Sequence, residues 1–167
     1  MSTHGDRFII FFSEEGIKAL AKCENYFADS TFFAAPKDYK QVFTLHASKQ
    51  HNSIPSVFAV TQKKNEATYM EVFQKVKERA YTYGLQLNQK KIICDYEKAQ
   101  YNAFKFHFTN AEIKGCWFHF CQAIYKRSVQ EIGKKKVNDY TYKTWISKLT
   151  ALALVPIDRI NYALGKL

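Results

Sequence analysis

The order of β-rich and helical segments is the feature that most limits which folds this chain can adopt. Six short β-rich runs are expected to form strands, at residues 8–12, 25–32, 42–47, 56–62, 91–97 and 111–116. Helices are expected over EEGIKALAK (14–22), from Asn65 to Gly84, and from Trp117. Another helix is expected to carry Ala99, Ala103 and Phe106 on one face, and a last one to carry Trp145, Leu149 and Leu152 and to end at Pro156. Several strands followed by alternating α and β units predict an α/β domain with a mixed sheet and flanking helices.

Two aspartates lie on strands of this expected sheet. Asp29 falls within NYFADSTF, which otherwise reads as a buried strand, and burying an unpaired carboxylate costs several kcal/mol. Asp95 lies at the end of the strand that follows the first long helix. Ribonuclease H-like nucleases have this order of elements, and neighbouring strands would bring the two carboxylates to one place, where they could share divalent cations. The alternative is that both are turn or capping residues, with Asp95 capping the helix near Glu97.

The charge and composition of the chain favour a polyanionic partner. Lys and Arg number 25 against 15 Asp and Glu, which gives a formal net charge of +10. Nucleic acid suits such a charge better than a membrane surface, although a merely soluble basic surface is the alternative. No apolar run is long enough to span a bilayer, and the start MSTHGDRFII lacks the features of a signal peptide, so we expect an intracellular protein. Reduced thiols or metal ligands, not disulfides, are expected at Cys23, Cys94, Cys116 and Cys121.

Five sequence blocks follow one another along most of the chain: FADSTFFAAPKDYKQVFTLHA, EATYMEVFQKV, CDYEKAQYNAF, NAEIKGCWFHFCQAIYK and LTALALVP. In order and at similar spacing they resemble the transposase domain of Mutator-like elements (MULE transposases), and the resemblance runs from about Phe11 to Leu164. It implies a ribonuclease H-like fold with two catalytic aspartates and a glutamate, which use Mg²⁺ or Mn²⁺ to cut and rejoin DNA in the nucleus. Asp29 matches the first aspartate, in an Asp–small–Thr–Phe block, and Asp95 matches the second, in an Asp–aromatic–Glu block.

The third carboxylate of that family has no match in this chain. The family's glutamate comes after the ALALVP block, but no glutamate follows Glu131. The other acids considered match no family motif, although Asp158 is expected to cap a last short helix; they are Glu112, Glu131, Asp139 and Asp158. We therefore expect one truncated domain over 1–167, with the start of its first strand in 1–12 and a C-terminal helical segment at 133–167. A decayed copy, a truncated gene model and a domesticated remnant that binds DNA or protein without catalysis all fit this expectation.

A Cys–His pair lies between the second aspartate and the end of the chain. Cys116 and His119 match the Cys-x-x-His pair of the resembled family, which suggests a zinc site. Structural zinc sites usually close with four ligands, so packing of Cys116 and hydrogen bonding of His119 is the alternative. The nearest side chains that could complete a site are those of Cys121 and His107. We expect His46 to be a structural histidine and His51 to lie in a solvated loop.

Basic residues recur along the chain, and those after Trp117 are the candidates for DNA binding. They are Lys126, Arg127, Lys134, Lys135 and Lys136. Such side chains neutralise backbone phosphates without reading sequence, and binding of this kind depends strongly on salt. The alternative is that they form ordinary exposed helix faces, from which only the triple lysine stands out by its density. GKKK (133–136) is expected to be a basic link between two helices.

Overall fold

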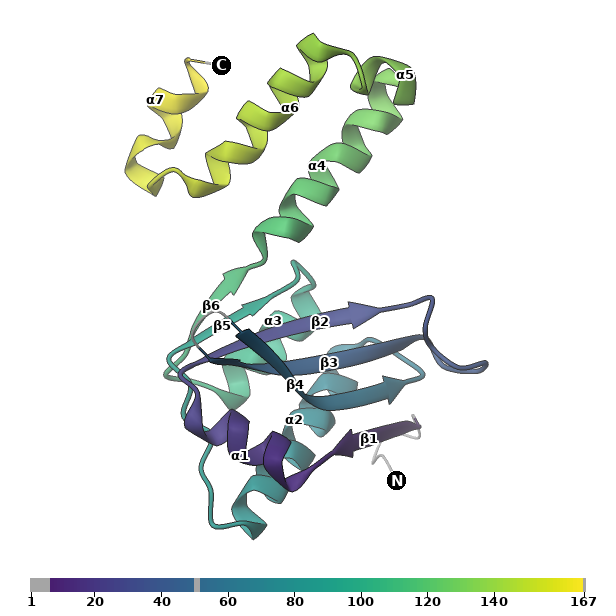
Figure 1. Cartoon of the computed structure of the whole chain (residues 1–167), viewed down its shortest axis with the longest axis vertical. Helices are drawn as coiled ribbons and strands as arrows, with labels where there is room; N and C mark the ends of the chain where they lie inside the picture. The colour runs from purple at the N-terminus through teal and green to yellow at the C-terminus, as the bar shows by residue number, and fades with distance from the viewer. Residues whose placement is uncertain (1–6, 50–51, 167) are drawn as a thin grey trace. The chain divides into compact units, whose positions relative to one another are not determined.

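The computed structural model describes residues 7–49 and 52–166 and divides the chain into two compact units (Figure 1). Met1–Lys114 form the first, named here the sheet unit, and Gly115–Leu167 form the second, named the helical unit. The sequence predicted a single domain with a helical segment from residue 133, whereas the helical unit begins 18 residues earlier (133 − 115). Residues 1–6 of the predicted N-terminal segment, and His51, lie outside the described residues.

Within the described residues, the sheet has six strands in the order β1-β4-β3-β2-β5-β6. Their bounds are β1 (Phe8–Phe12), β2 (Asn25–Thr31), β3 (Gln41–Lys49), β4 (Asn52–Thr61), β5 (Lys91–Cys94) and β6 (Glu112–Gly115). The pairs β1–β4, β4–β3 and β3–β2 are antiparallel, whereas β2 and β5 are parallel. The predicted α/β class with a mixed sheet is confirmed, and the arrangement is consistent with a ribonuclease H-like fold.

The helices begin and end mostly where the sequence signals predicted. The sheet unit contains α1 (Glu14–Lys22), α2 (Glu66–Thr82) and α3 (Lys98–His107). The helical unit contains α4 (Trp117–Ile132), α5 (Lys134–Val137), α6 (Tyr140–Ala151), α7 (Ile160–Leu164) and two short 3-10 turns, η1 (Leu152–Leu154) and η2 (Ile157–Arg159). Asn65 caps α2 because its side chain accepts a hydrogen bond from the backbone N–H of Thr68 at 2.9 Å. Gly84 follows that helix with φ of +67°, a conformation that glycine adopts without strain.

Three local predictions were wrong. Phe106 was expected to share a buried face with Ala99 and Ala103, but it is 66% exposed, and Phe104 fills the core instead. The lysines at 134–136 were expected to form a link, but they lie in α5, which begins immediately after Gly133. Asp158 does not cap α7, because Arg159 holds the N-cap position of that helix.

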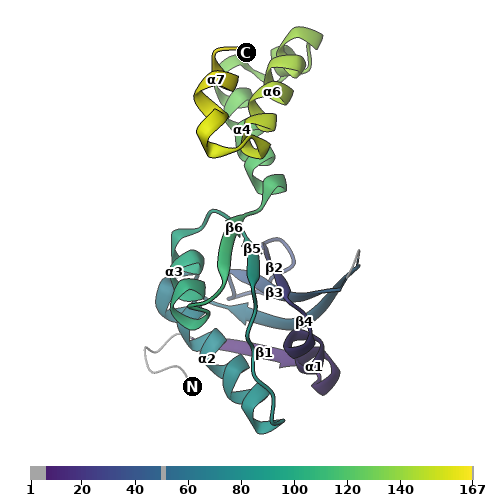
Figure 2. The same cartoon turned by 90° about the vertical axis from the view of Figure 1, so that its left-hand side faces the viewer.

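The core lies on one face of the sheet, against which α2 and α3 pack side by side (Figure 2). Tyr26 and Ala28 of β2 point to this face, as alternate residues of a strand must. The aromatic ring of Phe73 on α2 stacks on Phe104 of α3, with ring centroids 4.3 Å apart, and meets Phe43 of β3 edge to face. These contacts fix both helices on one side of the sheet.

The opposite face of the sheet remains largely accessible in the sheet unit. Phe27 is half-buried there and Asp29 is exposed. Tyr26 and Ala28, which alternate with them along β2, are buried in the core on the other face. Ile9, Phe11 and Phe58 are exposed on β1 and β4. β2 is therefore a half-buried strand and not the fully buried strand that its sequence suggested, so the carboxylate of Asp29 does not carry the cost of burial.

The contact between α1 and β4 generates the first testable prediction. A Cβ atom on Gly16 of α1 would lie 2.6 Å from the backbone oxygen of Ser56, which is too close for any real pair. We expect Gly16→Ala to destabilise the chain by about 1–3 kcal/mol despite the better helix propensity of alanine. Urea unfolding measures the change. Gly165→Ala is the control because its Cβ would lie 3.6 Å from the nearest atom; equal midpoints for the two variants would contradict the prediction.

Candidate functional site

Asp29 lies in β2, and Asp95 directly follows β5, the parallel neighbour of β2. Three residues of β2 pair with the residues 66 positions later in β5: Asn25 with Lys91, Tyr26 with Ile92 and Phe27 with Ile93. The same register continued by two positions would bring Asp95 beside Asp29. Parallel neighbours lie about 4.8 Å apart across a sheet, and residues with the same register point to the same face. The strands that carry the two aspartates are therefore adjacent, as the sequence predicted.

Both aspartates occupy the carboxyl ends of parallel strands, where α/β sheets commonly bind ligands. Asp29 lies in the second half of β2, and Asp95 is the first residue after β5. One carboxylate oxygen of Asp29 accepts a hydrogen bond from the backbone N–H of Ser30 at 2.8 Å, and one of Asp95 accepts from Tyr96 at 2.6 Å. The N-cap of α3 is Glu97 and not Asp95, so the alternative in which Asp95 caps that helix is wrong.

The donor set of this pair suits a hard divalent cation. Mg²⁺ and Mn²⁺ prefer oxygen ligands, and two carboxylates on one face of adjacent strands supply them. Across residues 7–49 and 52–166, however, no group of three or more His, Cys, Asp or Glu side chains is arranged to hold a metal. The other acids that sequence analysis considered serve elsewhere: Glu131 pairs with Arg127, Glu112 pairs with Lys114, and Asp139 caps α6. The site consists of two carboxylates and the elements that position them.

A half-buried histidine lies on the same face as Asp29. His46 of β3 is paired with Phe27, and Thr44 is paired with Asp29, so His46 is the diagonal neighbour of Asp29 across the sheet. Its Nδ1 atom is 3.1 Å from the hydroxyl of Ser53. Burial lowers the pKa of His46, and the charge of Asp29 opposes that shift. These contacts agree with the structural role expected for His46 and place it within the surroundings of the site.

Sequence analysis did not predict a set of polar contacts that joins the segment after β5 to α2. Glu97 makes no capping hydrogen bond at the start of α3 but forms an ion pair with Lys64, with the nitrogen and oxygen 3.4 Å apart. The hydroxyl of Tyr69 accepts a hydrogen bond from the side-chain amide of Gln41 at 2.9 Å. Burial raises the pKa of Tyr69 to about 12, and the charge of Glu97 contributes to that increase. The segment from Asp95 to Glu97 is thus tied to Lys64, which precedes α2, and its charge reaches Tyr69 within α2.

The sequence contains only a faint signal for these contacts. Tyr69 was assigned to the core face of α2 by its spacing, and a tyrosine hydroxyl on such a face needs a polar partner. Glu97 was read together with Asp95 as part of one motif. Neither observation indicates that the two side chains approach each other, because they come from helices that meet only in the folded chain.

Cys116 and His119 begin α4 of the helical unit. Cys116 is the N-cap residue, and His119 follows within the first turn. Residues three apart share one side of a helix, whereas Cys121, two residues beyond His119, faces elsewhere. His107 ends α3 in the sheet unit, where burial lowers its pKa. Zinc binding by Cys116 and His119 stays a prediction, and metal analysis of the chain with and without Cys116→Ala distinguishes it from packing.

The basic residues selected for DNA binding all lie in the helical unit, and they differ in their contacts. Arg127 forms an ion pair with Glu131, with the nitrogen and oxygen 2.6 Å apart. The ammonium of Lys126 donates to the side chain of Gln122 at 2.9 Å. Lys134, Lys135 and Lys136 of α5 are exposed. The three α5 lysines therefore form the densest exposed positive charge among these candidates.

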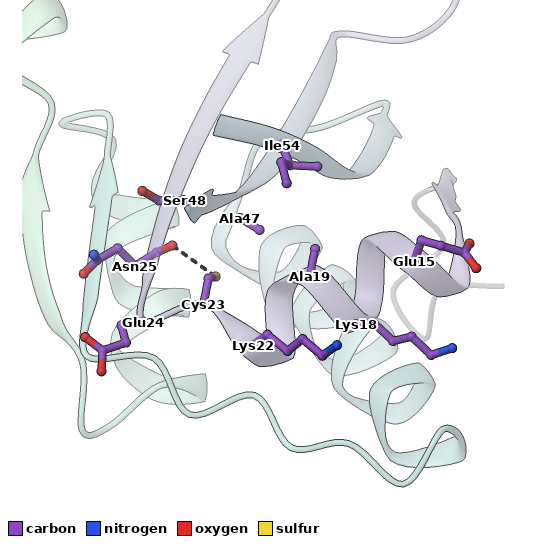
Figure 3. A pocket seen from close by; sticks show the side chains of 10 residues that line it. All are labelled: Glu15, Lys18, Ala19, Lys22, Cys23, Glu24, Asn25, Ala47, Ser48 and Ile54. Atoms are coloured by element: carbon purple, nitrogen blue, oxygen red, sulfur yellow. Dashed lines mark hydrogen bonds between the residues drawn. The ribbon is translucent and has the colours of Figure 1, made fainter. Parts of the chain in front are cut away.

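A pocket of about 610 Å³ lies away from the aspartates, between α1, the start of β2 and the hairpin of β3 and β4 (Figure 3). Its lining includes Cys23, Asn25 and Ile54. The thiol of Cys23 donates to the backbone oxygen of Asn25 at 3.2 Å, and burial raises its pKa, so the sulfur stays protonated and weakly nucleophilic. Asn25 is four residues before Asp29, about 13 Å along an extended strand. This pocket is therefore no part of the two-aspartate site.

The buried hydroxyl of Tyr69 generates a prediction about pH. The folded chain raises the tyrosine pKa from 10 to about 12, so its contribution to stability is complete below pH 10 and is lost as the pH rises through 12. We expect the free energy of unfolding to fall by about 2–3 kcal/mol more in the wild type than in Tyr69→Phe over this range. Chemical unfolding at several pH values measures it. Tyr81→Phe, at an 80% exposed site, is the control; parallel profiles for wild type and Tyr69→Phe would contradict the prediction.

Comparison with known proteins identifies the family of the chain. Within the described residues, every helix is too short or too polar to cross a membrane. No curated protein matches the chain. Residues 26–123 match the family model of the MULE transposase domain. The match covers more than half of the sequence, runs from β2 into α4, and includes Asp29, Asp95, Cys116 and His119. The chain therefore belongs to the family of MULE transposase domains, as its sequence blocks predicted.

Proposed function

We propose that Asp29 and Asp95 are the first two carboxylates of a DDE-type catalytic site for metal-dependent DNA cleavage and strand transfer. The observation that supports this most is the parallel pairing of β2 with β5, because the same register continued by two positions would bring Asp95 beside Asp29. Membership of a transposase family supports DNA as the substrate. Neither aspartate alone would distinguish a catalytic from a structural carboxylate.

The proposed chemistry is an in-line displacement at a phosphodiester. Bound Mg²⁺ or Mn²⁺ would activate the attacking oxygen and stabilise the leaving oxygen. In this proposal, Asp29 and Asp95 hold the cation, and the sheet keeps both carboxylates on its exposed face. The ion pair between Lys64 and Glu97 anchors the segment that carries Asp95, so it supports the geometry without touching DNA. A nuclear location belongs to the same proposal.

The residues described here supply an incomplete set of ligands. Catalytic sites of this class need a third carboxylate to fix two cations around the scissile phosphate, and among the described residues no group of three or more His, Cys, Asp or Glu side chains is arranged to hold a metal. We therefore propose that this chain binds one divalent cation weakly and is a poor catalyst without a further glutamate.

A second candidate function is DNA binding without catalysis, as in a domesticated transposase. The absence of a third ligand from the described residues favours it, and so do the exposed lysines of α5. In this case the two aspartates would be relics of an active enzyme. The two candidates make different predictions about DNA cleavage.

A plasmid nicking assay tests the proposal. We expect no more than trace nicking of supercoiled DNA by this chain in Mg²⁺ or Mn²⁺, because two carboxylates cannot position both cations. Weak Mn²⁺ binding, with a Kd of about 0.1–1 mM, should be detectable by electron paramagnetic resonance, since a site with few carboxylates has a weak affinity. The double variant Asp29→Asn, Asp95→Asn should lose this binding.

The control is Asp38→Asn, a carboxylate in the turn between β2 and β3 with φ of +74°, which asparagine tolerates. It should leave Mn²⁺ binding unchanged. Robust nicking that the double variant abolishes would show that a third ligand has been missed. Mn²⁺ binding that survives in the double variant would remove the two aspartates from the metal site.

A further inference from the structure

The positive charge of the chain is concentrated in the helical unit. Residues 115–167 carry nine Lys and Arg against three Asp and Glu, a net charge of +6, whereas residues 1–114 carry sixteen against twelve, a net charge of +4. Two of the three acids in the helical unit have local tasks: Glu131 pairs with Arg127, and Asp139 accepts a hydrogen bond from the backbone N–H of Thr141. A unit of this charge favours a polyanion over an apolar protein partner.

Exposed aromatic side chains accompany this charge. In the sheet unit, large aromatic residues such as Tyr69 and Phe73 fill the core. In the described part of the helical unit, the only buried hydrophobic side chain is that of Val137. Tyr142 and Trp145 of α6 are 39% and 47% exposed. These two rings therefore leave a large apolar surface accessible on α6.

The two tryptophans of the chain have different surroundings. The indole N–H of Trp117 donates to the backbone oxygen of Thr150 at 3.2 Å and so joins α4 to the end of α6. Trp145 instead has the ammonium of Lys148 over its ring, 5.9 Å from the centroid. Tyr142, Trp145 and Lys148 are spaced by three residues and therefore share one side of α6. α6 contains no acidic residue.

The same pairing of ring and lysine occurs at a second place in the helical unit, and a further tyrosine shares a groove with lysines. Lys166 lies 5.7 Å from the ring centroid of Tyr162. Tyr125 lines a groove of about 370 Å³ together with Lys126 and Lys134. An aromatic face beside an ammonium matches a nucleotide, because the ring stacks on the base while the ammonium pairs with the phosphate.

We propose that the side of α6 formed by Tyr142, Trp145 and Lys148 binds unpaired bases of single-stranded DNA. The rings of Tyr142 and Trp145 stack on bases, and Lys148 contacts the adjoining phosphate. Duplex DNA does not offer its base faces, so it binds the helical unit through phosphate contacts alone. This inference shares its DNA partner with the proposed function, but it concerns a site in the helical unit and requires neither aspartate.

Intrinsic fluorescence tests the inference directly, because the chain has only two tryptophans. In a Trp117→Phe background Trp145 is the sole reporter. We expect a thymidine oligonucleotide of about 16 residues to quench its fluorescence, and a blunt duplex of the same length to bind without quenching at the same salt concentration. Circular dichroism verifies that the background variant keeps its helices.

Affinity measurements on variants locate the contact. Trp145→Ala should weaken single-strand binding about five- to hundredfold and leave duplex binding within about twofold, while Trp145→Phe should retain most of the affinity. Ile157→Ala is the matched control, since that apolar side chain is 90% exposed in the same unit, and it should change neither. The triple variant Lys134→Ala, Lys135→Ala, Lys136→Ala should weaken both forms and reduce the salt dependence of binding.

The outcomes separate this inference from the proposed function. The inference would be overturned if duplex and single-stranded DNA bound with equal affinity, without quenching and without an effect of Trp145→Ala. DNA would then remain the partner. Absence of binding to either form at low salt would count against both. Self-association that Trp145→Ala abolishes, in place of quenching, would assign this side of α6 to a second copy of the chain and would also overturn the inference.

Discussion

The parallel pairing of β2 with β5 is the interaction on which the candidate site depends. Side chains of a strand alternate between the two faces, so a slip of one residue in this pairing would put Asp95 on the core face while Asp29 stayed exposed. The core prevents such a slip. Tyr26 and Ala28 of β2 and Ile92 and Cys94 of β5 are buried at equivalent positions, and a slip would expose Ile92 and Cys94 and bury charge. The packing that holds α2 and α3 on one face therefore also keeps Asp29 on the other.

The core face of the sheet carries the contacts that stabilise the sheet unit. The core face carries the aromatic contacts among Phe43, Phe73 and Phe104, which stabilise the sheet unit. Near its edge, the ion pair of Lys64 with Glu97 and the buried hydroxyl of Tyr69 introduce polar groups below the segment that bears Asp95. The buried hydroxyl of Tyr69 favours one arrangement of neighbouring elements, because any other arrangement would leave it without its partner. A transposase site needs such rigidity, since carboxylates must meet a cation at fixed distances.

The helical unit follows a different design. Its helices expose aromatic rings beside lysines, and α6 combines Tyr142, Trp145 and Lys148 on one side without an acidic residue. The sequence revealed the basic residues but treated Trp145 only as a mark of helical periodicity. The helix propensity of lysine and the glycine at 133 account for the short helix found at Lys134–Val137 in place of the expected link.

Much of this protein can be predicted from local patterns. The order of strands and helices, the Asn65 cap, the family and the identity of Asp29 and Asp95 all follow from periods, turn residues and motif blocks, because these depend on neighbours in the chain. Which face Asp29 occupies, its position beside Asp95, and the approach of Glu97 to Lys64 and Tyr69 depend on residues about 30 to 66 positions apart. The sequence determined which carboxylates were available. Only the tertiary structure decided that β2 and β5, the strands on which they depend, are parallel neighbours, because strand register is set by the burial of Tyr26, Ala28, Ile92 and Cys94 in a common core and not by any local propensity.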